Sequence, residues 1–107
     1  MTDQRGPRTV DRETLLGARL RLPQHVVHRS FVAETVVLNL KTGMYHGLNP
    51  SGGRMLEILN EAPSVREAAG ILAQEYPQQA GIEADLLAFC RDLLDRDLVE
   101  VVTDGSS

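Results

Sequence analysis

The sequence predicts an α+β domain of the winged helix-turn-helix type, in which a three-stranded antiparallel sheet is followed by three helices. Two observations lead to this prediction. Residues 20–48 contain short runs of β-branched residues, which favour extended structure. From Asn49 onward, apolar residues recur every three or four positions between capping residues and prolines, a pattern typical of short amphipathic helices.

Three short strands account for the extended region. Val26 and Val27 mark the first, and the runs Thr35–Leu40 and Met44–Leu48 form the other two. The break between these two runs contains Gly43, which tolerates the positive φ that a tight hairpin turn requires. The last two strands should therefore form an antiparallel hairpin.

Two helices are expected next. Asn49 can cap a helix by accepting a hydrogen bond from its first turn, and the proline that follows suits the first helical position. This helix should end near Pro63, because proline cannot continue it. Ser64 and Glu67 form a capping box that starts a second helix ending near residue 75.

The third helix, expected over Ile82–Asp95, has the broadest apolar face of the three. Its apolar stripe contains Ile82, Leu86, Phe89, Cys90 and Leu93, and is widened by Leu87 and Leu94. Residues 98–102 alternate weakly and should form a short terminal strand or an extended tail.

Length and composition indicate one domain, since the chain has 107 residues of which 42% are hydrophobic. We expect a flexible N-terminal tail over residues 1–18, a folded domain over 19–102 and a disordered tail over 103–107. The N-terminus lacks the apolar run of a signal peptide or membrane anchor, and a single cysteine cannot form an intramolecular disulfide. A cytoplasmic location away from the membrane is therefore expected.

Charge is distributed unevenly within the net charge of −4. Residues 1–54 carry eight Lys/Arg and four Asp/Glu, whereas residues 55–107 carry three and eleven. A winged helix usually binds DNA through its last helix, but the acidic residues around the third helix would repel phosphates. We therefore expect no nucleic acid partner.

Few residues suggest chemistry. His25 and His28 lie in strand-like sequence, where odd spacing points them to opposite faces, so we expect no metal site. Cys90 lies on the apolar stripe and should be a buried thiol instead of a nucleophile. Gly52 and Gly53 lack the Lys-Ser/Thr of a phosphate-binding loop, and their place at a helix start fits close packing or, as the alternative, weak anion binding.

Carboxylates around the third helix have no apolar enclosure in the sequence, so they should form a solvated face and not an acid-base pair. They are Glu83, Asp85, Asp92, Asp95 and Asp97. No nucleophile, base and electrostatic stabiliser can be assembled from the chain. We therefore expect a binding module that is not an enzyme and uses no cofactor.

Four features recur in order between Thr35 and Val101. They are Tyr45-x-x-Leu48-Asn49-Pro50, the Met55–Leu59 helix, the Ser64-x-x-Glu67-Ala68-Ala69 helix, and Asp85–Phe89 before Leu93 and Leu98–Glu100. As an ordered set, and not through any single motif, they resemble the PqqD-like family, also called RiPP recognition elements. The resemblance covers about two thirds of the chain. It implies that residues 19–102 bind the leader of a ribosomally synthesised precursor peptide.

The segments His25–Val27 and Thr42–Pro50 are most similar to members from lasso-peptide clusters. In these clusters a discrete module presents the precursor leader to a separate cysteine protease. The chain ends soon after the resemblance, which implies a free-standing module. The nearest alternative is a stand-alone PqqD that serves a radical-SAM enzyme. A structural adaptor that binds only its enzyme, or a DNA-binding winged helix, is the alternative from another class.

The resemblance implies a binding mechanism. The leader would add as an antiparallel strand to the free edge of the last strand, and its side chains would enter apolar pockets beside the third helix. Phe89 and Leu86 are the best pocket candidates, although the sequence does not divide this helix between core and pocket. The expected peptide-binding residues are Met44, Tyr45, His46, Gly47, Leu48, Asp85, Leu86, Phe89, Cys90, Asp92 and Leu93.

Overall fold

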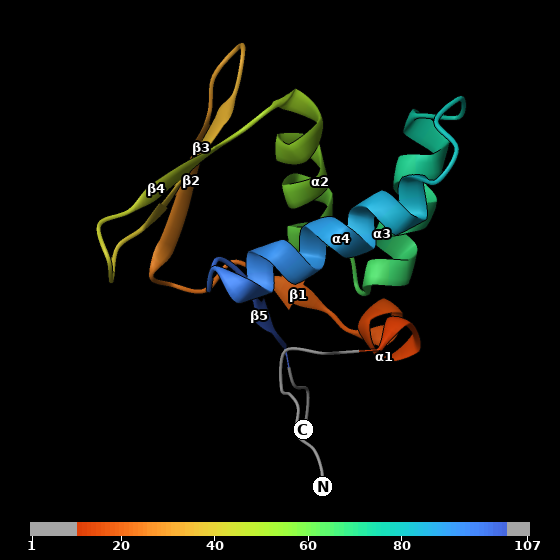
Figure 1. Cartoon of the computed structure of the whole chain (residues 1–107), viewed down its shortest axis with the longest axis horizontal. Helices are drawn as coiled ribbons and strands as arrows, with labels where there is room; N and C mark the ends of the chain where they lie inside the picture. The colour runs from red at the N-terminus through yellow and green to blue at the C-terminus, as the bar shows by residue number, and fades with distance from the viewer. Residues whose placement is uncertain (1–10, 103–107) are drawn as a thin grey trace, which may run out of the picture.

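The computed structural model describes residues 11–102 and contains a three-stranded sheet beside a group of helices (Figure 1). Its elements in chain order are α1 (Arg12–Gly17), β1 (Leu20–Arg21), β2 (Val26–Ser30), β3 (Thr35–Asn39), β4 (Tyr45–Leu48), α2 (Pro50–Glu61), α3 (Val65–Glu75), α4 (Ile82–Asp95) and β5 (Glu100–Val101). The predicted α+β class, with a three-stranded antiparallel sheet followed by three helices, is confirmed.

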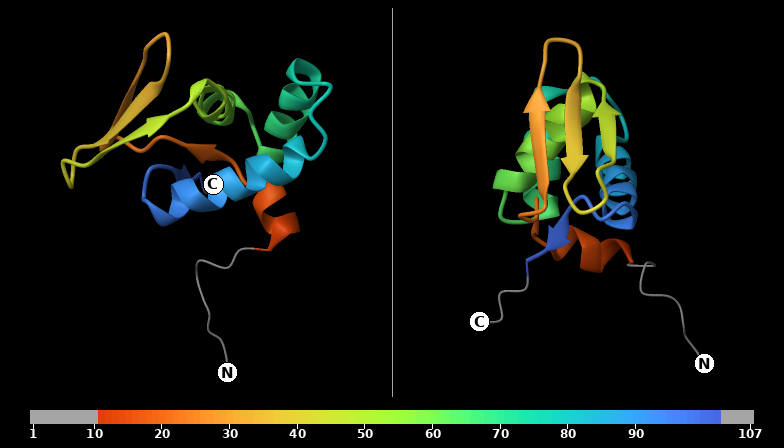
Figure 2. Two further views of the ribbon diagram at one scale, coloured as in Figure 1. Left: turned by 45° about the horizontal axis from the view of Figure 1, so that its top comes forward. Right: turned by 90° about the vertical axis from the view of Figure 1, so that its left-hand side faces the viewer.

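The larger sheet has the strand order β2-β3-β4, and both pairings are antiparallel. It projects from the helices, with one face turned toward α2 and the other face uncovered by any described element (Figure 2). For this reason the winged helix-turn-helix comparison fits only loosely. A second sheet joins β1 to β5 and brings the two ends of the described chain together.

The helix boundaries follow the predicted caps. The Asn49 side chain accepts a hydrogen bond from the Gly52 N–H at 2.8 Å, and α2 begins at the next residue, Pro50. The Ser64 hydroxyl accepts from the Glu67 N–H at 3.1 Å and starts α3. Short polar side chains thus satisfy N–H groups that the first turn leaves unpaired.

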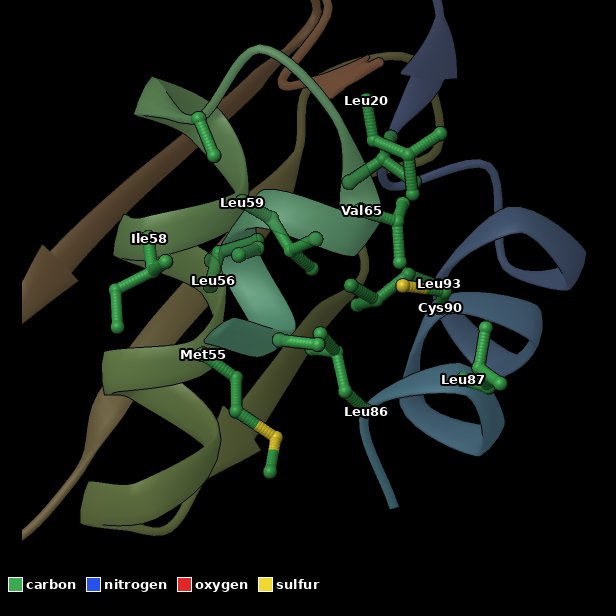
Figure 3. Packing of buried hydrophobic residues seen from close by; sticks show 14 of the residues in the cluster. Leu20, Met55, Leu56, Ile58, Leu59, Val65, Leu86, Leu87, Cys90 and Leu93 are labelled. Carbon is green, nitrogen blue, oxygen red and sulfur yellow. The ribbon is translucent and has the colours of Figure 1, made fainter. Parts of the chain in front are cut away.

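One apolar core lies between the helices and extends to the inner face of the sheet (Figure 3). Helix α2 supplies Leu56 and Leu59, and α4 supplies Leu86 and Leu93, all of them buried. From the sheet, Val37 is completely buried. Burial of these side chains is the main contribution that holds the layers together.

The predicted boundary of the N-terminal tail is wrong for its last third. Residues 12–17 form α1, in which Leu15 and Leu16 are only 1% and 2% exposed. The Asp11 carboxylate caps this helix by accepting a hydrogen bond from the Thr14 N–H at 2.8 Å. Burial of these two adjacent leucines in the core therefore stabilises α1, although most of its other residues are polar. The tails expected over residues 1–10 and 103–107 lie outside the described residues.

The two-stranded sheet is the second difference from the prediction. Strand β1 was not expected, whereas β5 confirms the short terminal strand expected within residues 98–102. Each of these strands has two residues, and their pairing joins parts of the chain some eighty residues apart. Such a pairing leaves almost no local pattern in the sequence.

A close contact places helix α2 against strand β3. A Cβ atom added at Gly53 would stand 2.3 Å from Thr35 Oγ1 and 3.0 Å from Thr35 Cβ. Thr35 is itself buried, and its hydroxyl lies 3.2 Å from the Ser30 hydroxyl. The helix can approach the sheet this closely only because residue 53 has no side chain, which confirms the packing role predicted for Gly53.

We predict that Gly53→Ala destabilises the fold by about 1–3 kcal/mol, because the added methyl group overlaps Thr35. Gly70→Ala is the matched control. Gly70 lies inside α3 with no atom within 4 Å of the position of an added Cβ, so alanine should stabilise by about 0.5–1 kcal/mol. Urea unfolding of both variants measures the difference, and equal free energies of unfolding would contradict the proposed contact.

Candidate functional site

Strand β4 is a free edge of the larger sheet. Its four residues pair with β3 on one side, and no described strand pairs with the other side. Figure 2 shows this side facing helix α4. An unpaired edge presents backbone N–H and C=O groups that another extended chain can bind.

The hydrogen-bond pattern identifies which β4 residues carry the free backbone groups. The Asn39 N–H donates to the Met44 C=O at 2.9 Å, so this pair is hydrogen-bonded. Hydrogen-bonded pairs recur at every second residue of an antiparallel ladder. His46 and Leu48, opposite Val37 and Thr35, therefore bond to β3. Tyr45 and Gly47 alternate with these bonded residues. Their backbone N–H and C=O groups therefore point toward the free edge.

Side chains of β4 alternate between the two faces of the sheet. His46 and Leu48 are half-buried and lie on the same face as the buried residues of β3 opposite them. Tyr45 is on the other face and is 72% exposed. A strand added at this edge would therefore place alternate side chains toward the helices and toward the uncovered face.

Helix α4 lies beside the inner side of this edge. The Arg96 guanidinium, one residue beyond the helix, lies 3.1 Å from His46 Nδ1. Its Nε donates to both carboxylate oxygens of Asp92, at 3.0 and 3.1 Å. The carboxyl end of α4 is thus linked to the middle of β4 by a chain of solvent-exposed polar contacts.

An aromatic side chain stands where β4 runs into α2. A Cβ atom added at Gly52 would lie 3.7 Å from Phe89 Cε1 and 3.4 Å from Leu48 Cβ. Phe89 is only partly buried and packs against the edge of the core. We call the four residues of β4 together with Phe89, Asp92 and Arg96 the edge site. It combines free backbone groups with an apolar ring and polar side chains.

The structure divides α4 between the edge site and the core. Asp85, Phe89 and Asp92 lie at least partly in solvent. Leu86, Cys90 and Leu93, which we expected in the peptide-binding surface, are 0%, 0% and 1% exposed. That expectation is wrong for these three residues: they lie on the side of α4 that packs into the core, as Figure 3 shows.

Apart from Asp85, the remaining expected residues come together at or near β4. Met44 is exposed just before the strand, and residues 45–48 form it. Asp85 lies one helical turn before Phe89 and accepts a hydrogen bond from Gln79 at 2.9 Å. The sequence analysis missed Arg96, and it predicted close packing for Gly52 without its place against Phe89. Neither belongs to a recognisable motif, and their places depend on how α4 and α2 pack.

Cys90 behaves as a structural residue. Burial raises the pKa of its thiol to about 12, and the nearby charge of Arg91 opposes this only in part. The thiol is therefore protonated at neutral pH and lacks the thiolate that a nucleophile needs. The predicted buried thiol is confirmed.

Two of the three histidines, His25 and His46, have polar side-chain partners. His25 Nε2 lies 3.1 Å from Asp97 Oδ2, whereas His28 is exposed on β2. Within residues 11–102, no group of three or more His, Cys, Asp or Glu side chains is placed to hold a metal ion. Over the same residues, no helix is both long enough and apolar enough to cross a bilayer.

The carboxylates around α4 form the predicted solvated face. Glu83 pairs with Arg12, and Asp92 pairs with Arg96. Asp85 and Asp95 are exposed to solvent. Exposed carboxylates of this kind lack the apolar enclosure that acid-base catalysis requires.

The fold and the edge site define a small α+β domain with an open strand beside a helix. The chain belongs to the PqqD family: the family model described as "Coenzyme PQQ synthesis protein D (PqqD)" matches residues 34–99. This range begins just before β3 and contains β4 and the three helices after it. The family resemblance seen in the sequence is thereby confirmed.

Two solved structures are similar to the chain. One is TbiB1 in complex with the TbiA(beta) leader peptide, at 32% identity and a TM-score of 0.68, with 78% of this chain and 99% of TbiB1 covered. The other is a lasso peptide synthetase B1 complexed with its leader peptide, at 23% identity with the same TM-score and coverage. The second supports the fold alone. No curated protein matches the chain.

Proposed function

We propose that this chain binds the leader of a ribosomally synthesised precursor peptide by strand addition to β4, and presents it to a separate processing enzyme. The observation that carries this proposal is the pair of free backbone positions, Tyr45 and Gly47, beside the partly exposed ring of Phe89. Backbone pairing would provide affinity and the ring would provide selectivity. The leader complex of the 32% identical TbiB1 supports the proposal.

The proposed enzyme is a lasso-peptide leader protease. The similarity of His25–Val27 and Thr42–Pro50 to members from lasso-peptide clusters favours it over the radical-SAM enzyme that a PqqD proper would serve. The module itself would be non-catalytic, since its cysteine is buried and protonated. Duplex DNA is a poor partner for α4 because residues 82–97 carry five acidic and two basic side chains.

A second surface suits the enzyme. On the uncovered face of the sheet, Val27, Leu38 and Tyr45 are cross-strand neighbours. Val27, Phe31, Val36 and Leu38 line a hollow there, and Phe31 is 58% exposed. Exposed apolar side chains gathered around one hollow are a candidate docking surface for a protein partner. An enzyme docked on this face would leave the inner side of the edge site free for the leader.

We predict that leader binding slows amide exchange at Tyr45 and Gly47 by about fivefold or more, since one net hydrogen bond contributes about 1 kcal/mol. His46 and Leu48 already bond to β3 and should change less. Hydrogen-exchange NMR with the cognate leader, or the TbiA(beta) leader as a surrogate, measures this. Unchanged exchange at Tyr45 and Gly47 at saturating leader would exclude strand addition at this edge.

Phe89→Ala should weaken leader binding by about 1–3 kcal/mol, the range for an anchor residue at an interface. Ile71→Ala is the control, because Ile71 is exposed on α3 and takes no part in the edge site. Calorimetry gives both affinities, and thermal unfolding of each variant separates binding from stability. If Phe89→Ala lowers only the stability, the ring belongs to the core alone.

Val27→Lys should leave leader affinity within about twofold of the wild type, because β2 is on the far side of the sheet from β4. It should slow leader removal by the protease tenfold or more, about 1.4 kcal/mol, since a charge would be buried in the docked face. Cleavage assays at saturating leader measure the rate. An unchanged rate would rule out this face as the docking surface.

A further inference from the structure

A carboxylate reaches across the sheet to the free edge. A Cβ atom added at Gly47 would stand 2.9 Å from Glu34 Oε1. Glu34 directly precedes β3, and its side chain lies over Gly47 on the uncovered face. Any side chain at residue 47 would displace it. The glycine therefore allows a charge from the turn between β2 and β3 to stand above the edge strand.

The Glu34 carboxylate has no cationic partner among residues 11–102. It makes no hydrogen bond or ion pair there, although Arg29 lies on the same face. Arg29 pairs with Val36, and Val36 pairs with Gly47, so two strand spacings, about 10 Å, separate the Arg29 backbone from that of Gly47. No ion pair joins Arg29 and Glu34 across this gap.

Antiparallel strand addition fixes which peptide residue would meet this carboxylate. The residue paired with Gly47 is on the same face as Tyr45 and Glu34, because paired residues share a face. The residue before it in the peptide lies opposite Leu48 and points to the inner face, toward Phe89. One position thus meets an acidic group, and the preceding position meets an apolar one.

We propose that Glu34 is a specificity-determining residue that selects Lys or Arg in the leader at the position paired with Gly47. The preferred leader contains an apolar residue followed directly by a basic one. This inference rests on the proposed strand addition at β4. Glu34 makes the edge site selective for the charge of the peptide as well as for its shape. The ion pair that provides this selectivity is exposed and forms only when the peptide is bound.

The test uses random peptides of about twelve residues displayed on phage, longer than the four residues of β4. The wild type should enrich peptides in which Lys or Arg follows an apolar residue. Glu34→Gln should lose the basic preference, and Glu34→Lys should shift it to Asp or Glu. Glu61→Lys is the matched control, since this exposed carboxylate ends α2 at the opposite end from the edge site and should leave the selection unchanged.

One enriched peptide is then compared with its Lys→Gln version. Wild-type affinity should fall roughly two- to fivefold, as expected for an exposed ion pair, and the difference should shrink at high salt. If Glu34→Lys selects the same basic peptides as the wild type, the role of Glu34 is wrong while strand addition stands. If the wild type enriches no peptide at all, the proposed function fails and this inference fails with it.

Discussion

The contact between Gly53 and Thr35 sets the geometry on which the edge site depends. It holds the first turn of α2 against β3, closer than any side chain at residue 53 would permit. Because α2 follows β4 directly through its cap, Asn49, the same contact fixes where β4 ends. The α2 start in turn lies against Phe89 through Gly52. Two adjacent glycines thus place the strand, the helix and the aromatic ring of the site.

Helix α4 contributes side chains both to the core and to the edge site, because its successive residues point in different directions around the helix axis. Leu86 and Leu93 face the core, while Phe89 and Asp92 occur at neighbouring positions and face outward. A turn of 3.6 residues separates adjacent positions by about 100°, so one helix can hold the core and line a site. The sequence shows a broad apolar stripe, but the direction of the core is decided by the elements that pack against it. This is why the sequence predicted the helix and not its division.

Elements with local signals were predicted well. Asn49 and Ser64 cap their helices through hydrogen bonds within three residues, and the turn containing Gly43 joins neighbouring strands. Helix α1 and the β1–β5 pair depend on distant partners: the Val65 N–H, for example, donates to the Ala18 C=O at 2.8 Å. Contacts between residues far apart in the chain leave little trace in local periodicity. For the same reason the sequence did not predict the roles of Arg96 and Glu34, which depend on contacts with residues of β4.

An open edge strand such as β4 can also pair with the same strand of a second copy of the chain, which would block the site. Strand β4 is short, has a glycine at its third position, and carries the Glu34 carboxylate above that glycine. If two copies paired β4 with β4, both carboxylates would approach the same narrow edge, and like charges across paired strands oppose association. A peptide with a basic residue at that position is attracted by the Glu34 carboxylate, whereas a second copy of the chain is repelled by it. The charge that favours the right partner is therefore also the one that disfavours self-association.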